Sequence, residues 1–274
     1  MTTMDAQGCI ESLHARIYDG TAWRDQDFPI VRETILEVFV NGGRIISLAC
    51  TGHHLDELAV GFLRSEGIVT DRKAIGKIEV DDAGKRVFVE TVSPVPLGAG
   101  SDRFSKAIAA SGARSSSLGQ RGLRKDPSRK SEGRDRLSQG LPLSAATVRA
   151  LMEELLASAP LHEATHGTHC AGLAEPGGLI CSREDIGRHN TIDMLGGYAL
   201  LGDLDCSEKI ILTTGRVSAE IVLKVWNLGI PVIISHSAPT SRAVELLRQA
   251  GITLVGHVRR GKMNLYTDRN RMIF

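Results

Sequence analysis

The second half of the chain alternates apolar segments typical of strands with amphipathic segments typical of helices. The expected order is helix 190–201, strand 209–214, helix 218–228, strand 231–235, helix 240–250, strand 253–258 and strand 263–267. Alternation of this kind favours a mainly parallel sheet with helices on both faces. The sequence therefore predicts an α/β fold, in which a ligand would bind beyond the carboxyl ends of the strands.

Polar residues follow the expected strand ends in this half. The stretch 183–190 separates the apolar run 179–181 from a helix, and similar junctions follow the strands that end near residues 214, 235 and 258. Helix starts present unpaired N–H groups, and basic side chains add charge, so these junctions suit a ligand with several phosphates. The alternative is ordinary helix capping with solvated charges. The candidate binding residues are Arg188, His189, Asn190, Gly215, Arg216, Ser218, Ser237, Thr240, Ser241, His257, Val258, Arg259, Arg260, Gly261 and Lys262.

The first half reads as a small α+β unit. It combines a hairpin (35–40 and 44–49), a helix (55–63) and a second hairpin (77–80 and 86–92), while residues 1–30 are expected to form an irregular arm with one short strand near 10–16. A helix capped by Ser144 and a hairpin-like pair at 168–174 and 179–182 precede the alternating part. The expected division is a subdomain at 1–100, a helix and mobile basic loop at 101–143, and an α/β/α sandwich at 144–274.

Residues 113–140 differ from the rest of the chain. They hold eight Lys and Arg against three Asp and Glu, with few large apolar residues. Such a segment cannot bury enough apolar surface to order itself, so we expect it to be mobile. It is interpreted either as a solvated linker or as a basic flap over an anionic ligand.

Composition excludes several classes. The formal net charge of +1 gives no global attraction to nucleic acid or to a membrane. No signal peptide and no apolar run of membrane-spanning length is visible. The five scattered cysteines include no CxxC pair, which favours a reducing, cytoplasmic environment and no disulfide framework. The GxxxxGK[ST] and GxGxxG nucleotide motifs are also missing.

Histidines cluster before one of the expected strands. His162, His166 and His169 with Cys170 are residue types that bind zinc, but they span a helix end and a strand start and need not converge. We therefore predict no tightly bound metal and interpret them as loop or pocket histidines. Cys170 follows His169 directly, which would suit an activated thiolate. Adjacent strand residues point to opposite faces, which favours a buried, inert thiol instead.

Several strings of the chain together resemble the FdhD family, the formate dehydrogenase accessory proteins. They are VNGGRI (40–45), DELAVGFLRSEGI (56–68), REDIGRHNTID (183–193), TGRVSAE (214–220), GIPVIISHSAPTS (229–241) and GITLVGHVRRGKMNLYT (251–267). The strings run in collinear order from about residue 35 to the end of the chain.

The resemblance implies a homodimer whose larger domain is a three-layer α/β/α sandwich similar to the cytidine deaminase-like fold. It implies a sulfur carrier that takes sulfur from a cysteine desulfurase as a cysteine persulfide and passes it to the molybdenum cofactor, bis(molybdopterin guanine dinucleotide), before insertion into formate dehydrogenase. The cofactor is held through its phosphates and guanines, so guanine nucleotide binding is expected. The resemblance also implies that the loop His257–Lys262 contacts this cofactor.

The chain departs from the family at the sulfur-carrying loop. The family's Ser-Ser-Cys-Gly-x-Cys-Gly corresponds to residues 116–122, where Leu118 and Arg121 stand in place of the two cysteines. A family TGGxHAA pattern corresponds to residues 165–171 and introduces Cys170 as a replacement candidate for the nucleophile. Three functions follow: a sulfur carrier that uses Cys170 or an unusual route, a cofactor-binding chaperone without sulfur chemistry, and a zinc-dependent deaminase. The last is disfavoured because the HxE and PCxxC motifs are missing.

Overall fold

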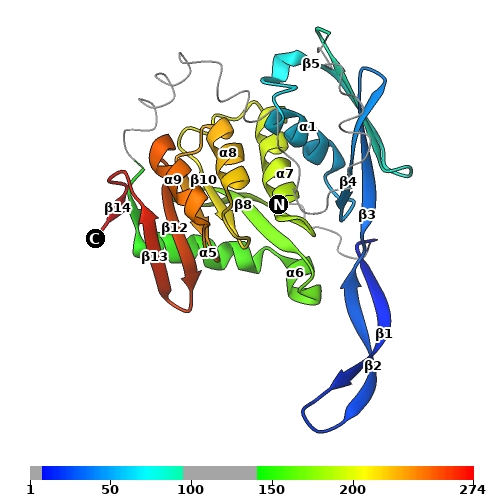
Figure 1. The fold of residues 1–274 in the computed structure, drawn as a ribbon, viewed down its shortest axis with the longest axis vertical. Helices are drawn as coiled ribbons and strands as arrows, with labels where there is room; N and C mark the ends of the chain where they lie inside the picture. Colours follow the sequence, from blue (N-terminus) through cyan, green and yellow to red (C-terminus); the bar gives the residue numbers. More distant parts are fainter. Residues whose placement is uncertain (1–7, 95–140) are drawn as a thin grey trace.

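The structure is a computed structural model that describes residues 8–94 and 141–274 (Figure 1). The basic segment 113–140, with Leu118 and Arg121, lies outside the described residues. The elements of the first part are β1 (Ile10–Tyr18), β2 (Trp23–Val31), β3 (Thr34–Val40), β4 (Gly43–Cys50), α1 (Leu55–Ser65), η2 (Arg72–Ala74), β5 (Ile75–Asp81) and β6 (Arg86–Thr91). Those of the second part are β7 (Leu143–Ser144), α5 (Ala145–Ala157), α6 (Pro160–Thr165), β8 (His169–Glu175), β9 (Gly178–Asp185), α7 (Arg188–Leu201), β10 (Ile210–Thr213), α8 (Ala219–Leu228), β11 (Val232–Ser235), α9 (Ser241–Ala250), β12 (Thr253–Arg259), β13 (Lys262–Thr267) and β14 (Met272–Ile273).

The large sheet is mixed. Its six strands lie in the order β13-β12-β11-β10-β8-β9, and only β10, β11 and β12 run parallel to one another. The expectation of a mainly parallel sheet is therefore wrong at both edges. The reason is local, because β8–β9 and β12–β13 are joined by two-residue turns, and such turns only connect antiparallel strands.

Helices cover both faces of this sheet. Ile211 and Ile233 point to the face packed by α7, α8 and α9, while Leu212 and Ile234 point to the face packed by α5. Successive residues of a strand alternate between faces, so the unbroken apolar runs of β10 and β11 supply both cores. The result is a three-layer α/β/α arrangement (Figure 1).

A smaller sheet belongs to the first part of the chain. Its order is β4-β3-β6-β5, with β3 and β6 parallel and the two hairpins on either side, so both predicted hairpins are confirmed. α1 covers one face of this sheet, and the shared core also takes in Met194 and Leu200 from α7. α7 is therefore covered on both sides, by α1 and by the large sheet. Its predicted amphipathic character is wrong because almost all of its residues are buried.

The two parts meet through glycines. A Cβ atom built on Gly61 of α1 would lie 1.7 Å from the backbone oxygen of Asp193, and one on Gly197 of α7 would lie 1.9 Å from the backbone oxygen of Glu57. The two helices therefore touch backbone to backbone. Ser65 adds a hydrogen bond of 2.6 Å to the Asp193 carboxylate across this joint.

An arm extends from the body of the molecule. β1 and β2 pair as an antiparallel hairpin over nine residue pairs and project away from both sheets (Figure 1). The sequence predicted only the first of these strands, because Asp25, Asp27 and Pro29 obscure the alternation in β2. The short helix α6 and the two-residue strands β7 and β14 were also missed. In the described ranges, none of the helices has the length and apolar character needed to span a membrane.

Candidate functional site

The polar junctions of the large sheet lie along one edge. β10 and β11 end side by side at Thr213 and Ser235, and the antiparallel pair β8–β9 places His169 and Asp185 at the same edge. The N–H of His236 donates to the Thr213 carbonyl at 2.9 Å. The structure thus brings together the four junctions that the sequence singled out.

Hydroxyl groups at this edge brace the loops. The Thr213 hydroxyl accepts from the N–H of Gly215 at 3.0 Å, and the Ser235 hydroxyl donates to the Gly215 carbonyl at 2.9 Å. The Ser235 hydroxyl also accepts from the N–H of Ser237 at 3.0 Å. Gly215 leaves room for the neighbouring helix start, since a Cβ there would lie 2.9 Å from the Cβ of Arg188. These buried hydroxyls hold the loop shapes.

The basic segment at 257–262 forms a tight turn. β12 continues to Arg259, which pairs with Lys262, and the two residues between them, Arg260 and Gly261, have φ values of 51° and 74°. Positive φ values at both central residues are typical of a type I′ turn, whose twist matches the right-handed twist of the two strands that it joins. His257 also has a positive φ of 52°, and its N–H donates to the Ser237 carbonyl at 3.0 Å. The expected loop is thus a rigid hairpin end with exposed basic side chains.

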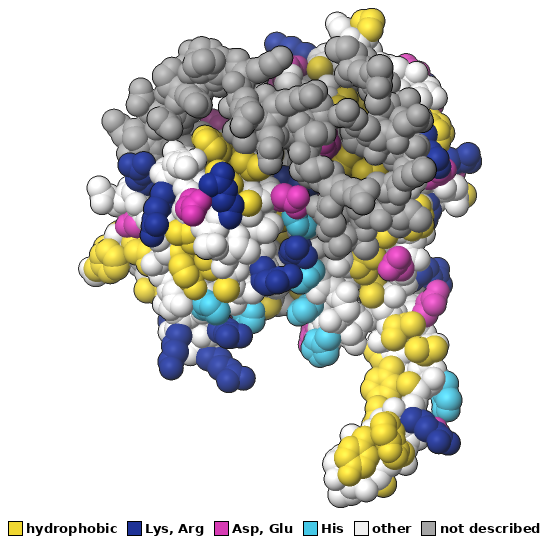
Figure 2. All heavy atoms as spheres, in the orientation of Figure 1, with side chains coloured by type: hydrophobic (Ala, Val, Ile, Leu, Met, Phe, Trp, Pro, Cys, Tyr) yellow, Lys and Arg dark blue, Asp and Glu magenta, His cyan; other side chains and the backbone are white. Residues whose placement is uncertain are grey.

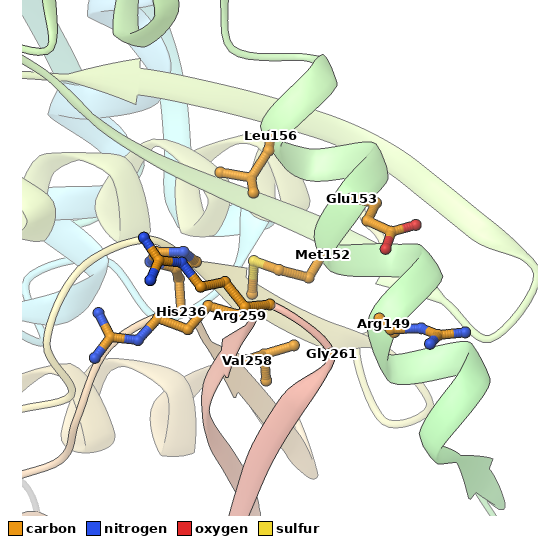
Figure 3. Close-up of a pocket in the computed structure, with 9 residues that line it drawn as sticks. Arg149, Met152, Glu153, Leu156, His236, Val258, Arg259 and Gly261 are labelled. Atoms are coloured by element: carbon orange, nitrogen blue, oxygen red, sulfur yellow. The ribbon is translucent and has the colours of Figure 1, made fainter.

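This turn forms one wall of a pocket of about 500 Å³, called here the arginine pocket. It is lined by Arg149, Met152, Glu153, Leu156, His236, Val258, Arg259, Arg260 and Gly261. Figure 3 shows Met152 and Leu156 of α5 facing Val258, His236 and Arg259 across it. The pocket combines an apolar wall with guanidinium groups at its mouth.

A second pocket of about 280 Å³, the histidine chamber, adjoins the first. It is lined by Leu156, His162, His166, Gly167, Thr168, His169, Ile186, Thr214 and His236, so Leu156 and His236 border both hollows. Figure 2 shows histidine and basic side chains gathered along one rim of the body. The two pockets form one polar face on the α5 side of the strand ends.

Three candidate residues belong to helix starts on the other face. The Ser218 hydroxyl accepts from the N–H of Ile221 at 3.5 Å, and the Thr240 hydroxyl accepts from the N–H of Ala243 at 3.3 Å. Ser241 is the first residue of α9. These residues cap α8 and α9, and they line neither pocket.

Arg188 and His189 begin α7 at the same edge. Within the described residues, Arg188 Nε and His189 Nδ1 are buried nitrogens without a hydrogen-bond partner. Burial, with the nearby Lys224 and Arg188 charges, lowers the pKa of His189 to about 3, although its Nε2 lies 3.6 Å from a Glu220 oxygen. The Arg188 Nε–H, which has no partner in the described part of the chain, is therefore a donor that a bound anion would satisfy.

Asn190 has a structural role instead. Its amide donates to the Asp185 carboxylate at 2.6 Å and to the Ala49 carbonyl at 2.8 Å, which ties α7 to β4. Asp185 also accepts from the N–H of Thr51 at 2.9 Å and of Gly187 at 2.9 Å. Burial raises the pKa of Asp185 to about 6, although these hydrogen bonds act to lower it. Because the carboxylate accepts both from Thr51, which follows β4, and from the start of α7, the network joins the two sheets and is not available to a ligand.

A second polar link joins the same two parts of the molecule. Arg183 makes a two-pronged ion pair with Glu57, with nitrogen–oxygen distances of 2.5 and 2.7 Å. Most of the acidic and basic residues in the stretch 183–190 therefore hold the fold together, and Arg188 is the exception.

Every cysteine of the chain lies in the described part, and none is exposed or paired. Cys170 lies in the core between α5 and the large sheet, where burial raises the pKa of its thiol. Burial likewise raises the pKa of Cys181, the least buried of the five, to about 11. A persulfide carrier needs a reachable thiolate, and no cysteine of this chain offers one.

The structure adds residues that sequence reasoning did not select. Arg149, Met152 and Leu156 come from α5, where Leu156 is 37% exposed. Leu156 belongs to the apolar face predicted for this helix, but only the fold shows that it lines a pocket. His236 stood in a recognised junction but was not chosen. In the described ranges, no group of three or more His, Cys, Asp or Glu side chains is arranged to hold a metal ion.

Comparison with known proteins gives a consistent family. The model of the FdhD/NarQ family matches residues 31–273. A protein of Shouchella clausii named sulfur carrier protein FdhD is 35% identical, with 90% of each chain covered, and one of the same name from Bacillus subtilis is 33% identical, with 89% of this chain and 90% of the relative covered.

A solved structure shares the fold. It is the crystal structure of a protein from Desulfotalea psychrophila described as a candidate formate dehydrogenase accessory protein, with a TM-score of 0.75, 24% identity and coverage of 97% of this chain and 100% of the other. At that identity the likeness shows the fold alone. The family match and the curated relatives show more: the chain belongs to the FdhD/NarQ family.

Proposed function

We propose that this protein serves the maturation of formate dehydrogenase by binding the molybdenum cofactor, bis(molybdopterin guanine dinucleotide), as its cargo. The observation that carries the proposal is the arginine pocket at the strand ends, with Arg259 and Arg260 at its mouth. Its volume of about 500 Å³ falls in the range of ordinary small-molecule sites, about 300–1,000 Å³. Such a pocket suits one nucleotide portion of the cofactor.

The chemistry of the pocket fits a guanine nucleotide. Guanidinium groups bind phosphate oxygens through paired N–H donors and stack on planar rings. Met152 and Leu156 provide an apolar wall for the base, and the unpartnered Nε of Arg188 lies along the same edge. Phosphates would bind at the turn Arg259–Lys262, with the base toward α5.

Sulfur transfer completes the proposal. We infer that a cysteine desulfurase supplies sulfur for the bound cofactor and that formate dehydrogenase receives the product; the name of the relatives, sulfur carrier protein, supports the sulfur step alone. The sulfur would reach the cofactor at the site formed by the two pockets.

One observation favours a second candidate, a cofactor-binding chaperone that carries no persulfide itself. Leu118 and Arg121 stand where the resemblance expects cysteines, and all five cysteines of the chain are buried or half-buried. In that case the desulfurase or another protein would bring sulfur directly to the cofactor bound here.

We also propose a homodimer, formed through the arm. Register places Leu13 opposite Phe28 and Ile17 opposite Arg24 on one face of the hairpin, with Glu11 at its base. A two-stranded hairpin is only marginally stable alone, and Leu13 is 51% exposed. Two arms packed face to face about a twofold axis would cover these apolar residues.

Calorimetry with guanosine diphosphate tests cofactor binding. Arg259→Ala should weaken binding by about 1–3 kcal/mol, the value of a charge-assisted hydrogen bond. Arg16→Ala, in the arm and away from both pockets, is the matched control and should bind as the original does. Equal affinity of both variants would reject the arginine pocket.

Incubation with a cysteine desulfurase and sulfur-labelled cysteine separates the two candidates. Label that stays on the chain and is released by a thiol reductant supports the sulfur carrier, and its loss in Cys170→Ala would locate it. A chain that binds guanosine diphosphate but takes up no label supports the chaperone.

Sedimentation tests the dimer. Leu13→Glu places a charge on the apolar face of the arm and should produce monomers. Ser12→Glu, on the opposite face of the same strand, is the control and should leave the dimer intact. A monomeric original protein at all concentrations would refute the arm interface.

A further inference from the structure

The histidine chamber is not explained by nucleotide binding in the arginine pocket. Its four histidines come from three separate segments: His162 and His166 from the region of α6, His169 from the start of β8, and His236 from the loop after β11. His162 and His166 lie with their ring centres 5.8 Å apart. Leu156 and His236 line both hollows, so the chamber and the arginine pocket adjoin.

The proton on His162 has a defined place. Its Nδ1 lies 2.6 Å from the carbonyl oxygen of Thr168, and a carbonyl only accepts, so Nδ1 carries the proton. The other nitrogen, Nε2, is then an acceptor in the neutral ring and becomes a donor when the ring takes up a second proton.

Positive charges surround the chamber. Burial lowers the pKa of His169, and Arg188, His162 and Arg216 lower it further. Burial also lowers the pKa of His236, helped by Arg259, His162 and His257. Burial and the neighbouring positive charges therefore both favour the neutral forms of His169 and His236.

Acidic side chains also lie near this cluster. Glu163 is exposed on α6, and Glu153 lines the adjoining arginine pocket. Two further acids, Glu184 and Glu220, have partners among the described residues. The Glu184 carboxylate accepts from the N–H of Leu161 at 3.1 Å and of His162 at 2.6 Å, beneath the chamber. Glu220 faces His189 and Arg188, outside the lining. Burial raises the pKa of Glu184, while its hydrogen bonds from the backbone N–H groups of His162 and Leu161 and the charge of His162 oppose this rise. Arg188 Nε keeps no partner within the described residues.

A cation does not suit this hollow. No three of these side chains are arranged to hold a metal ion within the part of the chain that the structure describes. Arg188, Arg216 and Arg259 would also repel a cation, as they lie close enough to shift the pKa of His169 and His236. An anion would be stabilised in this hollow, because the arginines attract it and its negative charge favours the protonated form of the imidazoles.

We propose that the histidine chamber is a second anion subsite, which takes a compact oxyanion at the opposite end of the ligand whose nucleotide phosphates lie in the arginine pocket. The pairing of the two subsites in one ligand rests on the proposed function, whereas the oxyanion subsite itself does not. In the proposed cargo, the compact oxyanion-like group is the metal-bearing end, and free inorganic phosphate shares its chemistry.

Binding should be coupled to protonation. Burial and nearby cations favour the neutral forms of His169 and His236 in the free chamber, and a bound oxyanion would raise the pKa of each ring that donates to it. Affinity should therefore rise as pH falls from 8 toward 6, by up to about tenfold per pH unit for each proton taken up.

Histidine carbon–proton NMR spectra of the full chain test this proposal, with molybdate and orthophosphate as separate probes. We expect the ring signals of the chamber histidines to shift on addition of either anion, more strongly at pH 6 than at pH 8. His169→Gln should weaken anion binding about tenfold or more. His14→Gln, on the exposed arm, is the control and should change nothing.

The same spectra with guanosine diphosphate distinguish the two proposals. If molybdate still shifts the chamber signals in protein saturated with guanosine diphosphate, the result supports two adjoining subsites. If orthophosphate displaces the molybdate, the chamber recognises the oxyanion chemistry that the two share. Histidine signals that respond to neither anion, while guanosine diphosphate binds, overturn the second subsite. A chamber that binds anions in a protein that binds no guanosine diphosphate overturns the proposed function and leaves the subsite standing.

Discussion

Substituting Gly197 by alanine should separate the two parts of this molecule. The new Cβ would lie 1.9 Å from the backbone oxygen of Glu57, whereas ordinary contact begins near 3.4 Å, so α1 and α7 must move apart by about 1.5 Å. A backbone carbonyl in a helix cannot rotate away. The shift would also strain the hydrogen bond between Ser65 and Asp193 and the ion pair between Glu57 and Arg183.

The expected loss is about 3 kcal/mol or more in the free energy of unfolding, because the overlap is with helix backbone, whereas overpacking in a core typically costs about 1–3 kcal/mol. Gly196→Ala is the matched control, because it adds the same group to the same helix one residue earlier. Its Cβ would meet only the Leu228 side chain, at 3.3 Å. Since alanine favours helix by up to about 1 kcal/mol, this control should be neutral or slightly stabilising.

Urea denaturation followed by circular dichroism measures both variants. A Gly197→Ala protein within about 1 kcal/mol of the Gly196→Ala protein would refute the backbone-to-backbone joint, because overlap with a helix carbonyl cannot be that mild.

Three further predictions concern stability and reactivity. The pKa of Asp185 is raised to about 6 in the folded protein, so the folded state holds its proton more tightly than the unfolded state. The free energy of unfolding should therefore be highest below the unfolded pKa and should fall by on the order of 3 kcal/mol as pH rises through 6. Asp185→Asn should remove that slope from unfolding free energies measured between pH 4 and 6.5, and an unchanged slope would refute the assignment. Arg183→Lys should lower the free energy of unfolding by about 1–3 kcal/mol, measured in urea, because lysine cannot form the two-pronged pair with Glu57. Cys170 should resist a thiol reagent in the folded protein and react on unfolding, followed by mass spectrometry; rapid labelling of the native protein would contradict its burial.

The sequence predicts where β10 and β11 of the large sheet end, because polar residues follow each apolar run at the point where a helix begins. The segments 213–218 and 235–241 each follow an apolar run and lead to a helix-capping hydroxyl, Ser218 or Thr240, so the sequence alone locates this edge of the sheet. The sequence could not tell which side of the sheet the ligand faces. Ser218 and Thr240 cap helices on one face, whereas the pockets lie on the other, under α5.

The joint and the chamber depend on distant contacts. Gly196 and Gly197 in the middle of a helix were a signal for close packing, since glycine there is costly without one, but nothing local names α1 as the partner. The histidines of the chamber come from segments more than 60 residues apart, from His162 to His236. No periodicity links such positions, so only the fold reveals that they line one hollow.

A crystal structure of the protein with guanosine diphosphate tests the central claim most directly. It should place the diphosphate within about 3 Å of the Arg259 guanidinium or of the backbone N–H groups of the turn ending at Lys262. It should also place the guanine against Met152 and Leu156 of α5. Nucleotide bound at another surface, with the arginine pocket filled by solvent, would contradict it.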